Sequence, residues 1–363
     1  MVSRHIIFFL PSLESVGGVE RIVCTLANQF AGQEHYQVSI LTCYGHSVAS
    51  AYTLHSRIHL YTLGVQTYPI AATKRIFWYL QLIKPLNRFL RHHPADMLLA
   101  EGGYLASTLA LTRRSRTKKI GCEHISHSYS TALQRLFRKV LYQRLDGLVV
   151  LTRHDLAHYQ RFLKKVFFIP NAFLHTPSDT IDYEKKVIVA AGRLTHQKGF
   201  DLLIEAFYLI HVHYPEWKLL IYGDGPLRSD LDTLIQARNL QQQIILAGNT
   251  AILYAKMKEA SVFVLPSRFE GFGMVLVEAM TCGLACVSFD CAGPNELMED
   301  QVSGIYAKQG DIHDLSKQLA RVLASASLRE KLGLQAKQKA KAFSLDAIMP
   351  KWRALMEYYF YHA

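Results

Sequence analysis

Short apolar runs alternate with amphipathic segments along the whole 363-residue chain. The runs are rich in Val, Ile, Leu and Phe, which is typical of strands that are buried on both faces of a parallel sheet. The segments between them, such as FDLLIEAFYLIH (200–211), carry apolar residues at helical spacing. This alternation predicts an α/β chain built on doubly wound parallel sheets.

The predicted strands fall into two groups. In the first half they are HIIFFL (5–10), QVSILTC (37–43), MLLAEG (97–102), KIGCEH (119–124), GLVVLT (147–152) and VFFIP (166–170). In the second half they are KVIVAAG (186–192), KLLIYG (218–223), QIILAG (243–248), VFVLPS (262–267) and ACVSF (285–289).

A polar stretch interrupts the alternation near the middle of the chain, at FLHTPSDTIDYEKK (173–186). Because 363 residues exceed what one core usually supports, we expect two Rossmann-like domains, residues 1–172 and 173–344. A last helix is expected over residues 345–363 with Ser344 as its N-cap. Its aromatic side chains must be buried, and packing on the first domain would bury them.

The composition excludes several classes of protein. Half of the residues are hydrophobic and 19% are charged, which fits a folded chain and excludes disorder. The first apolar run stops at Pro11, and no segment is apolar for the ~18 residues of a spanning helix, so a soluble or peripheral protein is expected. The six cysteines form no Cys-x-x-Cys pair, which predicts reduced core thiols in the cytoplasm.

The net charge of +12 is concentrated in the first half of the chain. Residues 1–170 hold 21 Lys and Arg against 8 Asp and Glu, whereas residues 171–363 hold 20 against 21. Such an excess attracts anionic membrane surfaces or nucleic acid. Nucleic acid is not expected as a partner, because the chain has no nucleic-acid-binding motif.

Basic residues cluster in three stretches of the first half. Lys84, Arg88 and Arg91 fall on one face of a predicted helix, and RRSRTKK (113–119) and RLFRKVLYQR (135–144) follow. Basic helices with aromatic flanks suit an anionic membrane surface. Ordinary solvated helix faces are the alternative.

Two glycines follow the first predicted strand. Gly17 and Gly18 precede the helical run ERIVCTLANQF (20–30). Glycines at a strand-to-helix turn let the backbone approach a ligand, and the helix N-terminus favours an anion. The third glycine of the dinucleotide fingerprint is missing, so a plain tight turn fits as well.

GRLTHQKGF (192–200) places two cations on the loop after a buried strand. Arg193 and Lys198 lie five residues apart, and Gly199 stands at the entrance of the next helix. Two cations at a helix N-terminus beside a parallel strand form a diphosphate site in outline. Two solvated surface charges are the alternative.

YGDGPLR (222–228) follows the next predicted strand. Gly223 would lie against a nucleotide or form a simple turn. Asp230 and Asp232 come next and superficially make an Asp-x-Asp metal pair. They fall inside a predicted helix, where residues at i and i+2 point apart, so no metal is expected there.

Two glutamates stand in SRFEGFGMVLVEAM (267–280), with seven residues between them. Gly271 and Gly273 break the chain after Glu270, and Glu278 falls one to two turns inside the helix that follows. The two carboxylates therefore flank a helix N-terminus, whose free N–H groups favour an anion. The acids accept hydrogen bonds from hydroxyls, and a sugar nucleotide offers both kinds of group.

His124, in GCEHISHSY (121–129), ends a predicted strand of the first domain. This position makes it a candidate for a hydrogen bond to a substrate hydroxyl or phosphate, although a purely structural histidine is more common. His127 is less well placed.

Together these segments resemble the retaining glycosyltransferases of the GT-B fold, family four. The matching pieces run in family order over nearly the whole chain: GGVER (17–21), GRLTHQKGF (192–200), YGDGPLR (222–228), LPSRFEGFGMVLVEAM (265–280) and GPNELMEDQVSGI (293–305). The resemblance implies two Rossmann-like domains facing each other across a cleft. The second binds the sugar nucleotide, the first binds the acceptor, and the last helix crosses back to the first domain.

The resemblance also implies roles for single residues of the second domain. Arg193 and Lys198 are expected to hold the donor diphosphate and to offset charge on the leaving group. Glu270 is expected to bind hydroxyls of the transferred sugar and Glu278 those of the ribose. The backbone amides near Glu270 belong to Gly271, Phe272 and Gly273.

In the first domain, His124 matches the histidine that approaches the donor sugar. Gly17 and Gly18 are expected near the donor phosphates or the acceptor, and Gly223 of the second domain near the nucleotide. No metal or other cofactor is expected. CAGPNE (291–296) is shorter and less basic than in many relatives, which leaves any ligand contact of that loop open.

The expected function is transfer of a hexose or N-acetylhexosamine, with retention, from a UDP-linked donor. The acceptor would be a lipid-linked saccharide of O-antigen, lipopolysaccharide or capsule synthesis, reached at the inner face of the bacterial cytoplasmic membrane. Three alternatives remain: a GDP-mannose-dependent mannosyltransferase, a nucleotide-sugar epimerase or phosphorylase on the same fold, and a non-catalytic membrane-bound subunit.

Overall fold

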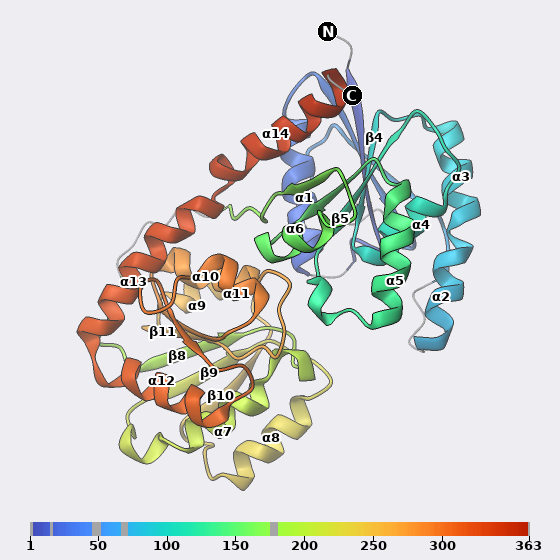
Figure 1. Ribbon diagram of the computed structural model, residues 1–363. Coiled ribbons are helices and arrows are strands. Elements are labelled where there is room, and N and C mark those ends of the chain that lie inside the picture. The colour runs from blue at the N-terminus through green and yellow to red at the C-terminus, as the bar shows by residue number, and fades with distance from the viewer. Residues whose placement is uncertain (1–2, 15–16, 46–51, 67–71, 175–180, 362–363) are drawn as a thin grey trace. The chain divides into compact units, whose positions relative to one another are not determined.

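The protein folds into two compact α/β units (Figure 1), seen here in a computed structural model that describes residues 3–14, 17–45, 52–66, 72–174 and 181–361. The first unit comprises Met1–Asn171 and Met349–Ala363, and the second comprises Ala172–Ile348. Each unit is built on its own parallel sheet. The predicted pair of doubly wound sheets is therefore confirmed.

The sheet of the first unit has seven strands in the order β3-β2-β1-β4-β5-β6-β7, and every neighbouring pair is parallel. The middle of the sheet is completely buried, as in residues 6–10 of β1. The strands are β1 (Arg4–Leu10), β2 (Tyr36–Thr42), β3 (Ile58–Thr62), β4 (Met97–Glu101), β5 (Lys118–Glu123), β6 (Gly147–Val150) and β7 (Val166–Phe168).

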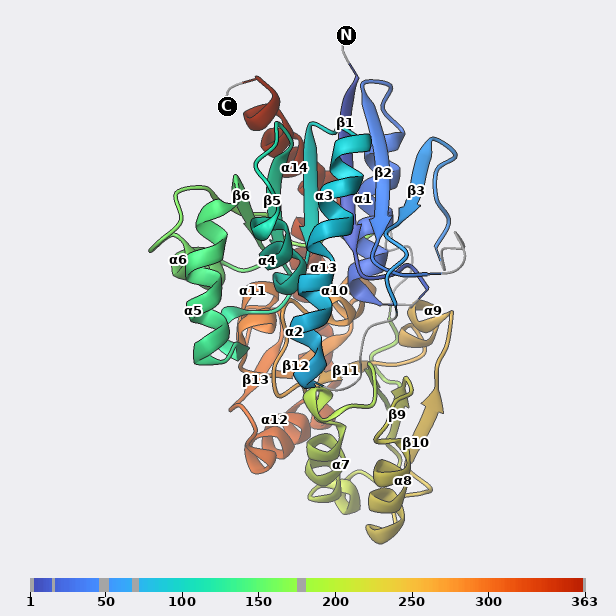
Figure 2. The ribbon, with the colours of Figure 1, turned by 90° about the vertical axis from the view of Figure 1, so that its right-hand side faces the viewer.

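Helices cover both faces of this sheet, with α1 on one side and α2 to α5 on the other (Figures 1 and 2). The buried side chains of Leu86, Leu105 and Leu109 pack on the second of these faces. The helices are α1 (Gly18–Ala31), α2 (Ala72–Gln81), α3 (Ile83–His92), α4 (Gly103–Leu111), α5 (Ala132–Leu141) and α6 (Arg153–Tyr159).

The second sheet has six parallel strands in the order β10-β9-β8-β11-β12-β13, the same winding as the first. The strands are β8 (Val187–Ala191), β9 (Lys218–Tyr222), β10 (Ile244–Gly248), β11 (Val262–Leu265), β12 (Ala285–Phe289) and β13 (Ile305–Ala307). The helices are α7 (Phe200–Tyr208), α8 (Arg228–Ala237), α9 (Leu253–Met257), α10 (Met274–Cys282), α11 (Ala292–Leu297), α12 (Ile312–Ala324) and α13 (Ala326–Ala340).

The structure holds two strands that the sequence pattern did not reveal, and both lie at sheet edges. β3 is only partly buried, so its residues form no continuous apolar run. β13 has three residues, which is too short to show a period.

The last helix, α14 (Leu345–Tyr361), begins at the predicted residue. The Ser344 hydroxyl accepts a hydrogen bond from the Ala347 amide at 3.3 Å, as an N-cap does. From Met349 onward the helix belongs to the first unit. There the Tyr359 hydroxyl donates to the Asp146 carbonyl at 2.6 Å.

The six cysteines are all buried and free of disulfides, as predicted. Among the described helices, none is long and apolar enough to cross a membrane.

Two cations that were counted with the surface charges lie inside the first unit instead. The Lys119 ammonium is buried and donates to the carbonyls of Thr112 and Arg113 at 3.0 and 2.9 Å. Burial lowers the pKa of this amine below its usual value. Lys119 is therefore unavailable to a membrane, unlike the other basic residues of the stretch 113–119.

The second buried cation is Arg138 of α5, the only basic side chain of that helix that points inward. Its guanidinium lies 3.4 Å from the Glu123 carboxylate and donates to the Ser130 hydroxyl at 2.9 Å. Glu123 also accepts hydrogen bonds from the hydroxyls of Tyr142 and Tyr159. A buried charge is tolerated only when paired in this way.

Replacing Arg138 by methionine leaves the Glu123 carboxylate buried without its counter-charge. We expect the free energy of unfolding to fall by about 3–5 kcal/mol, measured by urea denaturation. The matched control is Arg135→Met, one turn earlier and exposed, which should change stability by less than about 0.5 kcal/mol. Equal effects of the two substitutions would show that the pair does not anchor α5.

Candidate functional site

Two loops meet at the carboxyl edge of the second sheet. They follow β8 and β11, which are neighbours at the point where the strand order reverses. Open α/β sheets bind their ligands at such a point. The loop 192–199 carries Arg193 and Lys198, and the loop 266–273 carries Glu270. The fold thus brings these predicted site residues together at the expected edge.

The Lys198 ammonium and the Glu270 carboxylate form an ion pair across the two loops. Nζ lies 2.6 Å from Oε2, and the Ser267 hydroxyl donates to the same oxygen at 3.1 Å. The side chains are 18% and 12% exposed, so the pair is shielded yet reachable. Among the described residues, none hydrogen-bonds the second oxygen, Oε1.

Gly199 lets the two loops touch. Its φ of +67° lies in the left-handed region, and an added Cβ would stand 2.1 Å from the Pro266 carbonyl oxygen. Next to this contact, the Arg268 amide donates to the Gln197 carbonyl at 2.8 Å, and the Gln197 side chain donates to the Phe269 carbonyl at 3.1 Å. The loop backbones are therefore held in direct contact, with no space for a side chain at Gly199.

A second ion pair joins the loop 266–273 to the first turn of α7. The Arg268 guanidinium holds both carboxylate oxygens of Asp201 at 2.8 and 2.6 Å. Burial tends to raise the pKa of Asp201, but the hydrogen bonds and charge of Arg268 outweigh it and hold the pKa below its usual value. A paired carboxylate of this kind stabilises the folded state at neutral pH and loses that effect as the pH falls through the lowered pKa.

Glu278 is the fifth residue of α10, one to two turns inside the helix as predicted, and its side chain is buried. Gly273, with a φ of +97°, begins this helix in the left-handed region. Phe272 is buried, and its ring packs edge-on against Phe343 at 5.7 Å between centroids. Any part of Phe272 in ligand binding would therefore come from its backbone, as for Gly271.

Gly293 in α11 supports the Glu270 loop from another side. A Cβ there would lie 2.9 Å from the Glu270 carbonyl oxygen and 2.8 Å from that of Phe272. This is the role of the CAGPNE segment that the structure shows. Gly293 and Pro294 both lie within α11, which begins at Ala292.

Gly223 and Arg193 border the site. A Cβ on Gly223, with its φ of +130°, would stand 2.0 Å from the Gly192 carbonyl oxygen. Close backbone packing at the ends of β8 and β9 thus requires this glycine, whatever else it contacts. Arg193 is exposed on the loop after β8, and its side chain makes no hydrogen bond or ion pair with any described residue.

In the first unit, the predicted residues follow the carboxyl ends of two strands, β1 and β5. Gly17 and Gly18 start the 14-residue α1 after β1. His124 follows β5, and its Nε2 lies 2.6 Å from a carboxylate oxygen of Glu101 at the end of β4. Its other ring nitrogen, Nδ1, is buried with no hydrogen-bond partner among the described residues.

Comparisons with known proteins agree with this geometry. Residues 16–173 match the family model of Glycosyltransferase Family 4, and residues 175–339 match that of Glycosyl transferases group 1. The Staphylococcus aureus protein TarM, solved in complex with Fondaparinux, α-GlcNAc-glycerol and UDP, superposes with a TM-score of 0.81 at 16% identity, over 97% of this chain and 99% of that one. The chain is a GT-B glycosyltransferase of family four.

Relatives match over nearly their full length. The amylovoran biosynthesis glycosyltransferase AmsD of Erwinia amylovora is 26% identical over 367 residues, which cover 97% of this chain and 99% of AmsD. A Campylobacter jejuni enzyme is 27% identical over 366 residues, covering 96% and 97% of the two chains. Its name is GalNAc-α-(1→4)-GalNAc-α-(1→3)-diNAcBac-PP-undecaprenol α-1,4-N-acetyl-D-galactosaminyltransferase.

Sequence reasoning missed several polar residues of this glycosyltransferase. Glu101 carries no local motif, and only the pairing of β4 with β5 places it beside His124. Asp201 and Arg268 are 67 positions apart, so their pairing also depends on the fold. Asp230 and Asp232, in contrast, lie on the surface of α8 as predicted.

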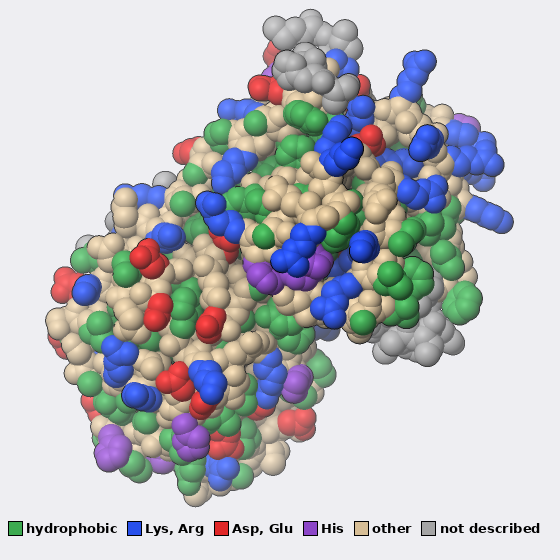
Figure 3. Space-filling view, viewed as in Figure 1, with side chains coloured by type: hydrophobic (Ala, Val, Ile, Leu, Met, Phe, Trp, Pro, Cys, Tyr) green, Lys and Arg blue, Asp and Glu red, His purple; other side chains and the backbone are tan. Residues whose placement is uncertain are grey.

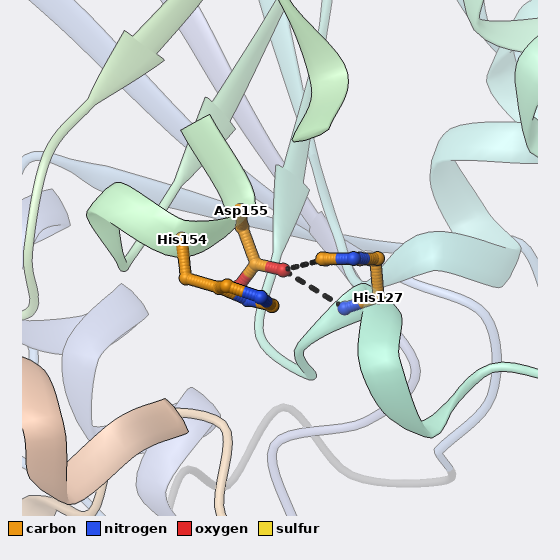
Figure 4. Close-up of side chains that lie close together, drawn as sticks. All are labelled: His127, His154 and Asp155. Atoms are coloured by element: carbon orange, nitrogen blue, oxygen red, sulfur yellow. Dashed lines mark hydrogen bonds and ion pairs between the residues drawn. The ribbon is translucent and has the colours of Figure 1, made fainter. Parts of the chain in front are cut away.

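His127, His154 and Asp155 form a polar cluster that the sequence did not reveal (Figure 4). Asp155 Oδ1 accepts from the Ser126 hydroxyl and from the backbone and ring nitrogens of His127, at 2.9, 2.9 and 2.7 Å. The His127 ring stacks on His158 at 3.6 Å between centroids. Burial, followed by the neighbouring charge of His127, lowers the pKa of His158 to about 4.

Asp155 also accepts a hydrogen bond from the Thr152 hydroxyl at 2.7 Å. Its carboxylate therefore joins the segment after His124 to the start of α6.

Substituting Gly199 by alanine tests whether the stability of the protein depends on the close contact between the loops 192–199 and 266–273. Gly310→Ala is the matched control, because Gly310 has a similar φ of +73° but nothing within 4 Å of its Cβ position. The control should cost about 1–2 kcal/mol for the left-handed backbone. Gly199→Ala should cost about 1–3 kcal/mol more for the added clash, measured by thermal unfolding. Equal losses would mean that the contact with Pro266 is loose.

Proposed function

We propose that this protein transfers a hexose or N-acetylhexosamine, with retention, from a UDP-linked donor to a lipid-linked saccharide. The observation that carries the proposal is the Lys198–Glu270 pair at the carboxyl edge of the second sheet. A cation next to a carboxylate, beside the N-terminus of α10, fits a ligand with a diphosphate next to sugar hydroxyls.

In this proposal, Lys198 divides its three N–H donors between Glu270 and the donor diphosphate. Glu270 fixes the ammonium at 2.6 Å and keeps Oε1 for a hydroxyl of the transferred sugar. Arg193, exposed on the same loop, adds a second cation, and Glu278 of α10 accepts from the ribose. The two cations offset the charge that builds on the diphosphate as the glycosidic bond breaks.

The transition state is proposed to resemble an oxocarbenium ion. Glu270 already pairs with Lys198 and Ser267, which suits a binding group better than a nucleophile. The leaving diphosphate takes the acceptor proton on the face from which it departs. His124, oriented by Glu101, hydrogen-bonds the transferred sugar, and the amides of Gly17 and Gly18 lie near the phosphates or the acceptor. The proposal requires no metal ion.

Relatives support the choice of ligands. TarM was solved with UDP, which supports a uridine nucleotide, and the Campylobacter enzyme is named for an undecaprenol-linked acceptor. The excess of cations in residues 1–170 supports an acceptor that is presented at an anionic membrane. We therefore propose that the protein acts at the inner face of the bacterial cytoplasmic membrane.

Lys198→Ala should raise the donor KM and lower kcat, so that kcat/KM falls by about 10²–10³-fold, because the leaving group loses its cation. Initial rates with a panel of nucleotide sugars, headed by UDP-hexoses and UDP-N-acetylhexosamines, measure this. Lys256→Ala serves as the control, since Lys256 is surface-paired with Glu259 on the same unit. An unchanged kcat/KM for Lys198→Ala would refute the proposed binding of the donor diphosphate by Lys198.

Glu270→Gln keeps the shape of the side chain but removes the charge that holds Lys198. We expect a loss similar to that of Lys198→Ala. We expect the double variant to lose less than the product of the two single losses, because the residues act as one unit. Full turnover by Glu270→Gln would reject the proposed role, and strictly multiplicative losses would reject the coupling.

A further inference from the structure

Helix α5 buries a charged side chain and exposes apolar ones, which is the reverse of an ordinary surface helix. Its buried side chain is Arg138, whereas Leu133, Leu136, Phe137 and Val140 are 59%, 60%, 55% and 60% exposed. Their spacing of three and four residues places these four on one face of the helix. We call this face the α5 stripe. An amphipathic helix normally buries such a stripe, so its exposure needs an explanation.

The buried ion pair fixes this orientation. Arg138 must point inward to meet Glu123 and Ser130, and Gln134, one turn earlier, donates to the Tyr104 hydroxyl at 2.6 Å. Since residues four apart share a helix face, these contacts turn the stripe outward. The stripe is therefore a consequence of the core of this unit rather than of a loosely packed helix.

The apolar surface continues onto α2 across α4. The Tyr104 ring stacks on Tyr79 at 4.7 Å between centroids, which joins α4 to α2. Phe77 and Leu80 of α2 are 69% and 47% exposed. Hydrophobic side chains gather over α2 and α5, with Lys and Arg side chains near them (Figure 3).

Basic side chains lie on α5 and along α3, beside this apolar surface, and no acidic residue lies on α5 or lines the groove along α3. α5 itself contains no Asp or Glu and exposes Arg135 and Lys139. Along α3, which directly follows α2, lies an open groove of about 1080 Å³. No carboxylate lines it, and its cations are Lys84, Arg88, Arg91, Arg113 and Arg114. Lys84, Arg88 and Arg91 all lie in α3 and are exposed, so their predicted alignment on one helix face is confirmed.

We propose that the α5 stripe enters the head-group region of an anionic lipid bilayer, while the cations of α5 and of the α3 groove bind lipid phosphates. Exposed apolar side chains flanked by unopposed cations match the two parts of such a surface, an apolar interior beneath anionic head groups. A protein partner of the same chemistry would need an acidic, apolar face instead. The inference refines the membrane placement proposed above and rests on it.

Vesicle sedimentation of the full chain tests this. The wild-type protein should bind vesicles of phosphatidylglycerol and phosphatidylcholine and bind pure phosphatidylcholine weakly. Leu136→Ser combined with Phe137→Ser should lower partitioning by at least about tenfold, since two apolar side chains leave the bilayer. The control is Leu334→Ser, which alters a leucine of similar exposure on α13 of the other unit and should leave partitioning unchanged.

Insertion is separated from electrostatic adsorption by a fluorophore. All six native cysteines are buried, so a polarity-sensitive dye on Phe137→Cys reports on the stripe and one on Leu334→Cys serves as its control. Only the first should brighten and shift to the blue on anionic vesicles. No spectral change there would overturn the proposal. So would a wild-type dimer in solution that the double serine variant abolishes, because the stripe would then bind a second copy.

The rate of nucleotide-sugar hydrolysis in vesicle-free buffer separates the test of the proposed function from the test of the α5 stripe. The double serine variant should keep the wild-type rate of nucleotide-sugar hydrolysis, because the stripe lies outside the donor-binding unit. Loss of vesicle binding with normal hydrolysis supports the inference. Wild-type protein that binds vesicles through the stripe but turns over no nucleotide sugar would overturn the proposed function and leave the stripe intact.

Discussion

The contact between Gly199 and the Pro266 carbonyl is the constraint on which the proposed donor site depends. The two loops come from neighbouring strands at the reversal of the strand order, and a glycine lets their backbones meet without a side chain between them. The Arg268–Asp201 pair then joins the loop 266–273 to the first turn of α7. Gly293 of α11 packs closely against the backbone of the same loop. Only because the loops are fixed in this way can Lys198 and Glu270 hold each other at 2.6 Å.

The first unit shows how a buried charge shapes an outer surface. Arg138 lies against Glu123 inside the unit, and this orientation exposes the apolar side of α5. Replacing such a pair by apolar residues is often neutral or stabilising, so stability alone does not require it. The proposed membrane contact gives the pair a second role, because it fixes which face of α5 meets the lipid. The donor chemistry and the membrane contact are thereby assigned to different units.

Much of the fold could be predicted because buried parallel strands form continuous apolar runs. The eleven runs all correspond to strands, and Ser344 was correctly placed before the last helix. The edge strands β3 and β13 lacked that signal. In the site, the loop positions of Lys198 and Glu270 followed from local sequence, but their direct pairing did not. Glu101, Asp201 and Arg138 depend on partners far away in the chain, and no local pattern distinguishes an inward arginine from a solvated one.

Hydrogen–deuterium exchange with UDP, and separately with GDP, tests the central claim most directly, namely that the nucleotide binds where the loops after β8 and β11 meet. The account predicts that one of the two nucleotides slows exchange in residues 192–199 and 268–278, the segments that carry Lys198, Glu270 and Glu278. Exchange across α12 and α13 should stay unchanged. Binding of either nucleotide without protection of these two segments would contradict the account.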